Sequence, residues 1–145
     1  MTTIAWDGRT LAADSRNTVG GMPFTGIKAY RLSDGRLYAG SGSAEDCEAV
    51  LQWLETRGDK PNVKDFAAIV IASEKCFRLE DKLVLIPVLT RFHAVGSGRD
   101  YAIAAMAMGK TAQEAVLLAC RFDIYSGPPV IELRQKSSLT VVRNA

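Results

Sequence analysis

Apolar and polar residues along this chain alternate in short segments that end at glycine, proline or aspartate. Two Asp-Gly pairs stand between apolar runs: one joins residues 3–6 to 10–13, and the other joins residues 28–32 to 36–40. An Asp-Gly pair in this setting predicts a β-hairpin, because both central residues of the tight turn need a positive φ. The Gly-rich stretch of residues 19–23 between the hairpins predicts a loop, with room for a bulge or a short strand.

A helix is predicted after the second hairpin. Ser43 is a favourable N-cap residue, and Asp46 three positions later gives a pattern similar to a capping box. The apolar residues that follow recur at helical spacing; they are Cys47, Val50, Leu51 and Leu54. Gly58 is expected to end this helix, and residues 58–62 form a linker.

Two more helices are predicted in the second half of the chain. Residues 100–108 are rich in alanine and methionine and stop at Gly109. Thr111 and Glu114 form a capping-box pattern that opens a helix running through Phe122.

The remaining apolar runs predict strands. They cover residues 66–72, 76–79, 82–95, 130–133 and 139–142, and the last two form a closing hairpin. Pro87 marks an edge or a bulge, because proline has no N–H to donate within a sheet. Helices grouped between antiparallel hairpins predict an α+β fold in which two sheets stack and the helices lie outside.

Composition narrows the class of protein. A chain of 145 residues with 48% apolar and 23% charged residues is expected to form one globular domain, residues 1–145. A net charge of +2 does not indicate a surface that binds nucleic acid. No apolar run is long enough for a membrane span and no signal peptide is recognised, so a cytoplasmic protein is expected. The three cysteines lack metal-ligand spacing, and no metal or cofactor is expected.

The candidate chemistry begins at Thr2, directly behind Met1. If Met1 is removed, Thr2 carries both a hydroxyl nucleophile and a free α-amine, and such an amine titrates near pKa ~7.7–8.0. The amine is then able to act as the base for the hydroxyl. This matters because the chain has one histidine, His93, which falls in a predicted apolar strand. Taken alone, however, Thr2 is more typical of an ordinary first strand, because many proteins begin this way.

Several separate segments, in one order along nearly the whole chain, strengthen the interpretation. They are Thr2-Thr3-Ile4, Ala12-Ala13-Asp14-Ser15, Lys28 before Tyr30-Arg31-Leu32, Ala39-Gly40-Ser41-Gly42, Val95-Gly96-Ser97-Gly98 and Asp123-Ile124-Tyr125-Ser126-Gly127. In this order the chain resembles a proteasome β-type subunit and the bacterial ring protease HslV, within the N-terminal-nucleophile hydrolases. The last segment is more similar to the proteasome than to HslV.

The resemblance implies a catalytic role for three of these residues. Thr2 would attack a carbonyl carbon, Lys28 would favour the alkoxide and lower the pKa of the amine, and Asp14 would pair with the lysine and keep it charged. Each residue also has a structural interpretation: Lys28 suits the solvent edge of a strand, and Asp14 suits a turn at the end of one.

The resemblance also implies an accessory set. The N–H of Gly42 would hold the oxyanion near a helix N-terminus, and Ser97, Asp123 and Ser126 would hydrogen-bond the free N-terminus and a water. Ala44 would shape a specificity pocket. The structural alternatives are a strand-to-helix turn at Gly42, a helix cap at Ser97, and helix-terminal or turn roles for Asp123 and Ser126.

The function that follows is a threonine-type endopeptidase with a four-layer αββα sandwich, assembled as a homo-oligomeric ring that cleaves peptides or unfolded proteins. Residues 58–65 leave no room for the family's second helix, so one outer helix layer is thinned, and engagement of a standard α ring or an HslU-type ATPase unfoldase is not expected in the usual form. Two alternatives stay open: an amidase of the same class acting on a small amide, and an inactive structural protein that forms rings.

Overall fold

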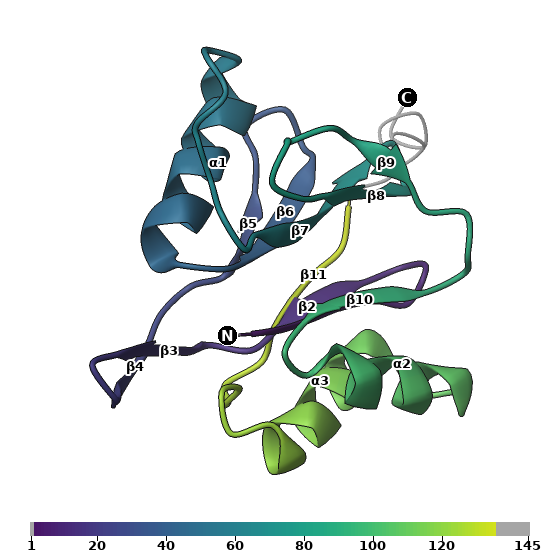
Figure 1. Cartoon of the computed structure of the whole chain (residues 1–145). Coiled ribbons are helices and arrows are strands. Elements are labelled where there is room, and N and C mark those ends of the chain that lie inside the picture. Colours follow the sequence, from purple (N-terminus) through teal and green to yellow (C-terminus); the bar gives the residue numbers. More distant parts are fainter. Residues whose placement is uncertain (1, 136–145) are drawn as a thin grey trace, which may run out of the picture.

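The computed structural model describes residues 2–135 of the chain, and Figure 1 shows their arrangement. Eleven strands and three helices lie within these residues. The strands are β1 (Thr3–Trp6), β2 (Leu11–Ala13), β3 (Arg16–Val19), β4 (Met22–Thr25), β5 (Ala29–Arg31), β6 (Leu37–Ser41), β7 (Ala67–Ala72), β8 (Lys75–Leu79), β9 (Ile86–Pro87), β10 (His93–Gly96) and β11 (Ile131–Leu133). The helices are α1 (Ala44–Thr56), α2 (Arg99–Ala107) and α3 (Ala112–Phe122). The α+β class predicted from the sequence is confirmed.

The first sheet has the order β10-β1-β2-β11, and its pairs are antiparallel. The predicted β1–β2 hairpin is confirmed, but its turn is longer than a tight Asp-Gly turn, because Trp6 pairs with Leu11. Within residues 7–10 Gly8 alone has a positive φ, 96°, and the Asp7 carboxylate accepts hydrogen bonds from the N–H groups of Arg9 and Thr10. β11 falls within the predicted strand at residues 130–133 and pairs with β2. The predicted partner strand at residues 139–142 lies outside the described residues.

The second sheet has the order β5-β6-β7-β8-β9 and is also antiparallel. The predicted β5–β6 hairpin is confirmed, but Arg31 pairs with Leu37, so the turn spans residues 32–36, and Gly35 alone has a positive φ there, 93°. The single strand predicted over residues 82–95 is wrong. Leu83 has a left-handed φ of 55°, and Pro87 lacks an N–H, so the segment splits into β9 in the second sheet and β10 in the first.

β3 and β4 form a separate two-stranded hairpin that projects from the body of the molecule (Figure 1). The sequence predicts a loop here because of its glycines. Gly20 and Gly21 have φ values of 57° and 81°, which are the positive values required at both central residues of a tight hairpin turn. The glycines therefore make the turn of a hairpin rather than a loop.

α1 lies on the outer face of the second sheet and buries Val50 and Leu54 there. Its predicted N-cap is confirmed, because the Ser43 side chain accepts a hydrogen bond from the Asp46 N–H. The helix ends one residue before the predicted Gly58: Arg57 takes the left-handed conformation at the C-cap, with a φ of 56°. Between Arg57 and β7, the structure contains no second helix, as the short linker predicts.

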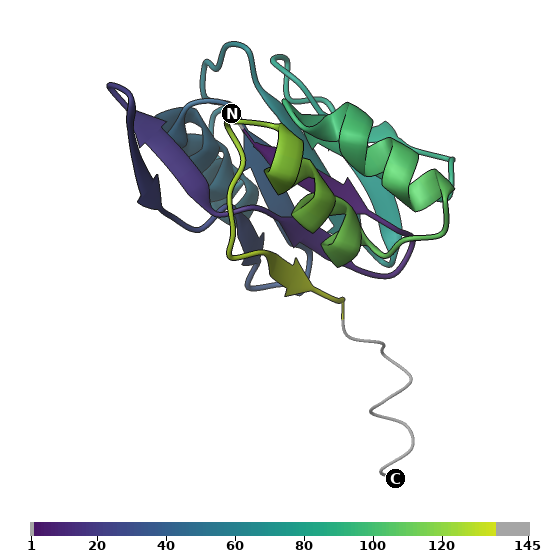
Figure 2. The ribbon, with the colours of Figure 1, turned by 90° about the horizontal axis from the view of Figure 1, so that it is seen from below.

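α2 and α3 lie side by side on the outer face of the first sheet (Figure 2). The predicted capping box at the start of α3 is confirmed, since the Thr111 and Glu114 side chains each accept a hydrogen bond from the other residue's backbone N–H. The contact between these helices and the sheet consists largely of alanine; the sheet contributes Ala5, Ala12 and Ala94, and the helices contribute Ala102, Ala105, Ala112 and Ala115. Small side chains allow the helices to approach the strands closely.

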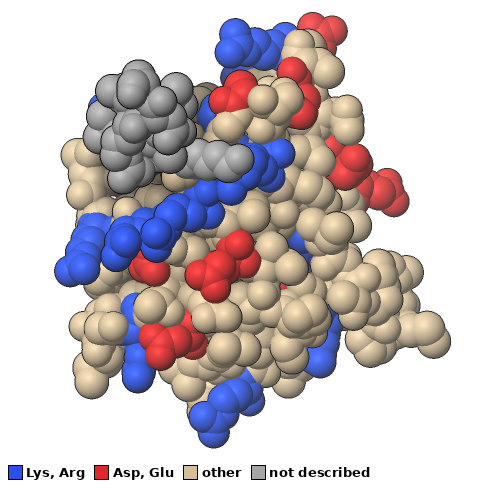
Figure 3. Space-filling model, turned by 180° about the vertical axis from the view of Figure 1, so that it is seen from behind, with Lys and Arg blue, Asp and Glu red and all other residues tan. Residues whose placement is uncertain are grey.

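A third group of apolar side chains lies between the two sheets. Ile4 and Leu11 of the first sheet belong to the same buried cluster as Leu37 and Ile69 of the second. No helix in the described range is long and apolar enough to cross a membrane. The face seen from behind carries an elongated band of basic side chains with acidic side chains on both sides of it (Figure 3).

Candidate active site

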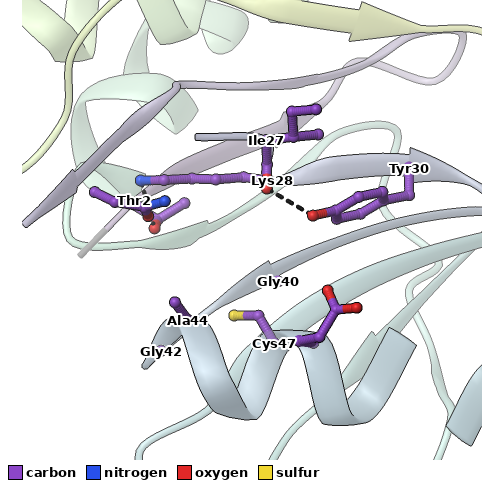
Figure 4. A pocket seen from close by; sticks show the side chains of 10 residues that line it. Thr2, Ile27, Lys28, Tyr30, Gly40, Gly42, Ala44 and Cys47 are labelled. Atoms are coloured by element: carbon purple, nitrogen blue, oxygen red, sulfur yellow. Dashed lines mark hydrogen bonds between the residues drawn. The ribbon is translucent and has the colours of Figure 1, made fainter. Parts of the chain in front are cut away.

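Thr2, Asp14 and Lys28 meet at one end of the first sheet. Thr2 directly precedes β1, Asp14 directly follows β2, and Lys28 directly precedes β5. The Lys28 Nζ lies 3.0 Å from Thr2 Oγ1 (Figure 4). The same Nζ lies 3.1 Å from Asp14 Oδ1. All three residues are buried. The β1–β2 hairpin sets the distance between the threonine and the carboxylate, so these two residues are positioned by the first turn of the chain.

The Asp14 carboxylate accepts hydrogen bonds from several donors besides Lys28. Its Oδ1 accepts from the Thr3 N–H at 3.0 Å, and its Oδ2 accepts from the N–H groups of Arg16 and Gly127 at 3.1 and 3.0 Å. Buried polar and charged groups are stable where hydrogen bonds replace those to water, and each Asp14 oxygen has such partners. The side chain therefore connects the start of β1, the start of β3 and the loop after α3.

The electrostatic state of Lys28 reflects two opposing effects. Burial lowers the pKa of its amine below the ordinary value, while the Coulomb attraction and hydrogen bond of Asp14 act to raise it. A lysine in this setting is easier to deprotonate than one in water, yet it remains paired with a carboxylate. Such a group is suited to stabilise a developing negative charge on the Thr2 hydroxyl.

Ser97, Asp123 and Ser126 form a second group on the other side of Thr2. The Thr2 nitrogen donates to Ser97 Oγ at 3.2 Å. Ser97 and Ser126 both donate to the same oxygen, Asp123 Oδ2, at 2.6 and 2.5 Å. Ser97 follows β10, and Asp123 is the C-cap residue of α3. The C-terminal end of α3 therefore places the Asp123 carboxylate near Thr2. The structure therefore brings these three predicted residues together around the Thr2 nitrogen.

Gly42 and Ala44 border the same pocket as Thr2. Gly42 has a φ of 145°, a conformation that glycine tolerates and other residues rarely adopt, and it directly precedes the N-cap of α1. Ala44 is the first residue of α1. Both residues occupy the part of the site in which the helix N-terminus favours negative charge.

The pocket beside Thr2 has a volume of about 210 Å³. Besides the predicted residues, its lining includes Tyr30, Cys47 and Glu48 (Figure 4). Burial raises the pKa of the Cys47 thiol to about 11, so the sulfur stays protonated at neutral pH and is a poor nucleophile. The hydroxyl of Thr2 is consequently the candidate nucleophile of this pocket.

Thr3 also lies in this group of side chains, and the sequence did not single it out. This residue is fully buried, and its Oγ1 lies 2.7 Å from Ser126 Oγ. A Cβ added to Gly98 would collide with the Thr3 side chain, so the glycine is needed for this close approach. The available signal was a polar residue at the start of an otherwise apolar strand, but only the fold shows which groups it meets.

The described residues contain no cluster of three or more histidine, cysteine or carboxylate side chains arranged to hold a metal ion. Cys47, Cys76 and Cys120 are free thiols. His93 lies on β10, where its Nε2 is 2.9 Å from Arg78 Nη1.

Comparison with known proteins places this geometry in context. No protein-family model matches the chain, and neither does the sequence of any curated protein. Among solved structures, BPH of Thiobacillus denitrificans is similar with a TM-score of 0.73 and 20% identity, over 94% of this chain and 98% of that chain. The same values hold for BPH in complex with epoxomicin, over 99% of that chain. HslV of Trypanosoma brucei is similar with a TM-score of 0.71 and 20% identity, over 92% of this chain and 99% of that chain. This chain has an HslV-like fold.

The HslV-like fold accounts for the order of the short motifs along the sequence. Motifs that are far apart in the chain, at residues 2–4, 95–98 and 123–127, converge at one end of the first sheet. A likeness at 20% identity establishes the fold and not the role of any residue. The chemistry has to be argued from the side chains.

Proposed function

We propose that this protein is a threonine-type endopeptidase of the proteasome/HslV kind, in which Thr2 becomes the N-terminal residue and serves as the nucleophile. The observation that carries the proposal is the 3.0 Å distance between Lys28 Nζ and Thr2 Oγ1, in a buried setting where the same lysine is paired with Asp14. The Thr2 hydroxyl accepts a hydrogen bond from this buried cation, and the backbone nitrogen of Thr2 donates one to Ser97. These are the surroundings that an N-terminal nucleophile needs.

In the proposed reaction, the α-amine of Thr2 accepts the hydroxyl proton, directly or through a water, while Oγ1 attacks the peptide carbonyl carbon. The N–H of Gly42 and the dipole of α1 stabilise the oxyanion. Collapse of the tetrahedral intermediate expels the amine half of the peptide, which takes the proton, and leaves an ester on Thr2. A water then hydrolyses the ester and restores the hydroxyl. Ser97 and Asp123 orient the amine through these steps.

The proposal requires cleavage of the bond before Thr2. While that bond is intact, the Thr2 nitrogen is a peptide amide and is unable to accept a proton. With the bond cut, the same nitrogen becomes an amine beside Ser97 Oγ, which is 3.2 Å away. Removal of Met1 is therefore the proposed activating step.

The wider features of the proposal concern the domain, its assembly and its partner. We propose a single αββα domain of the N-terminal-nucleophile class, with the layer outside the second sheet thinned to α1, that assembles as a homo-oligomeric ring in the cytoplasm and acts on peptides or unfolded chains. Because the link between α1 and β7 is short, the face next to α1 lacks the second helix that the family usually carries there. We therefore propose that an ATPase unfoldase, if one serves this ring, docks differently from an HslU-type partner.

Epoxomicin is the probe of choice, because a protein of the same fold is known in complex with it. The experiment combines intact-mass spectrometry of the purified protein with epoxomicin treatment and hydrolysis of fluorogenic peptides. A Met1-free chain that gains the mass of epoxomicin on Thr2, and loses both the adduct and the peptidase activity in the Thr2→Ala variant, supports the proposal. A Met1-free, folded protein that forms no adduct and cleaves no peptide overturns it.

A further inference from the structure

Thr3 stands between the two halves of the site. Its backbone N–H donates to Asp14 Oδ1 at 3.0 Å, which ties it to the half that contains Lys28. Its side-chain Oγ1 lies 2.7 Å from Ser126 Oγ, which ties it to the half that contains Asp123. One buried residue thus contacts both groups through two different polar atoms.

The direction of the side-chain hydrogen bond follows from counting protons. A serine hydroxyl has one proton to donate. The Ser126 proton is directed at Asp123 Oδ2, 2.5 Å away, because a carboxylate accepts and does not donate. Ser126 Oγ must then accept from the Thr3 hydroxyl. Ser97 Oγ lies 2.6 Å from Asp123 Oδ2 and 3.3 Å from the Thr2 carbonyl oxygen, and its one proton goes to the nearer, charged acceptor, so Ser97 presents a lone pair to the Thr2 nitrogen.

These bonds form one continuous series from Thr3 to the Thr2 nitrogen. The series runs from Thr3 Oγ1 to Ser126, Asp123 and Ser97, and ends at the nitrogen of Thr2. A second series of hydrogen bonds starts at the Thr3 N–H, which donates to Asp14, and continues from Asp14 through Lys28 to Thr2 Oγ1. The two series together form a ring that closes through residues 2 and 3.

We propose that Thr3 is a positioning residue that couples this ring and sets the basicity of the Thr2 α-amine. The inference rests on the proposed function, since it concerns the amine that acts there as the base. A hydroxyl that accepts a hydrogen bond becomes a better donor. Donation by Thr3 therefore strengthens the hydrogen bond from Ser126 to Asp123. The Asp123 carboxylate then attracts the Ser97 proton less strongly.

Loss of the Thr3 hydroxyl has a predicted direction. Without it, Asp123 draws more strongly on the Ser97 proton, and Ser97 Oγ becomes a stronger acceptor for the Thr2 nitrogen. This change favours the protonated amine, so the α-amine pKa rises by a fraction of a unit. At neutral pH the free-base fraction of the amine, and with it the rate of acylation, falls by the corresponding factor, about two- to threefold.

The experiment compares Met1-free wild-type protein with the Thr3→Val, Thr3→Ser and Thr10→Val variants. Thr3→Val keeps the branched shape and removes the hydroxyl, and Thr3→Ser keeps the hydroxyl. Thr10→Val is the matched control, because Thr10 is also a buried threonine beside the first sheet. One readout is the pH dependence of chemical acetylation of the Thr2 α-amine, followed by mass spectrometry without any turnover. The other is the pH profile of epoxomicin adduct formation.

We expect Thr3→Val to raise the amine pKa and to move the acid limb of the adduct profile to higher pH, while Thr3→Ser and Thr10→Val match wild type. If Thr3→Val does not fold, Thr3→Ala provides the hydroxyl-free variant, with the same expected shift. An unshifted amine pKa in a folded hydroxyl-free variant overturns the role of Thr3 alone. Absence of any adduct on wild type overturns the proposed function instead, so the two failures are distinguishable.

Discussion

Lys28 and Asp14 form a buried ion pair in which Nζ and Oδ1 lie 3.1 Å apart. Removing one member of such a pair leaves the other charge uncompensated. Replacement of Lys28 by methionine is therefore expected to lower the free energy of unfolding by about 3 kcal/mol, toward the low end of the usual range because backbone N–H groups still serve Asp14. Urea denaturation measures this loss.

The same substitution is expected to lower peptide hydrolysis by at least about 100-fold, since Lys28 also contacts Thr2 Oγ1. Lys110→Met removes an exposed lysine in the turn between α2 and α3 and serves as the control, with little change in either measurement. Retention of full activity in a folded Lys28→Met protein would contradict the proposed role of the lysine.

Gly98 offers a test of the packing around Thr3. A Cβ at this position would collide with the Thr3 side chain and press on Ala119 Cβ, so Gly98→Ala is expected to cost about 1–3 kcal/mol of stability. Gly58→Ala is the control, because its nearest neighbour is Thr56 Oγ1 at 3.7 Å, and it should be neutral or slightly stabilising. Thermal denaturation of the two variants separates the outcomes, and equal melting temperatures would refute the close approach.

Ala44 tests the assignment of the pocket. A larger side chain here would occupy part of the volume of about 210 Å³ beside Thr2. Ala44→Leu is expected to raise KM for peptides with bulky residues on the acyl side of the cleaved bond. Hydrolysis of peptides with small residues at that position is expected to stay unchanged. Ala107→Leu, at the exposed end of α2, should change neither. Identical KM values across a series of peptides in wild type and Ala44→Leu would show that substrate binds elsewhere.

His93 is the only histidine of the chain, which makes its titration easy to isolate. Arg78 is a donor only, so His93 Nε2 accepts and the ring is neutral; burial, and then the charge of Arg78, lower its pKa. As the pH falls below about 6.5, the unfolded chain takes up the proton first, so stability declines until the lowered folded pKa is reached. Above about pH 6.5 the ring is neutral in both the folded and the unfolded state, and this loss of stability is absent.

The measurement is the difference in melting temperature between wild type and His93→Gln from pH 7 to pH 5. Glutamine also accepts from Arg78 and does not titrate, so the wild type should lose more stability than the variant, by less than about 1 kcal/mol because the ring is half-buried. Parallel pH curves for the two proteins would show that the ring gains its proton as easily in the folded state as in water.

The sequence was sufficient wherever a local signal fixes the backbone. The Asp-Gly turns at Gly8 and Gly35 and the capping box at Thr111 are decided by neighbours within a few residues, and all three appear in the structure. The run over residues 82–95 was misjudged because hydrophobicity alone does not tell which sheet a residue joins. The backbone there turns at Leu83, a residue with no sequence preference for a left-handed φ.

The site was predictable only in part, for a related reason. Thr2, Asp14 and Lys28 were identified through the order of motifs, and the structure places them within hydrogen-bond distance. Thr3 was not identified, because its side chain hydrogen-bonds Ser126, more than a hundred positions away. Contacts over such a separation are set by how the sheets and α3 pack, and a single sequence carries no local trace of them.

The link between α1 and β7, where a second helix is absent, has a practical consequence. Its side chains from Arg57 to Lys60 are exposed, and it lies outside the second sheet, on the side of α1. Exposed polar loops of this kind accept inserted sequence with little effect on the rest of a fold. A peptide tag or a fluorescent reporter placed after Gly58 would leave both chain ends untouched. Because the proposed mechanism needs an unmodified amine on Thr2, the link is a suitable point for labelling and capture.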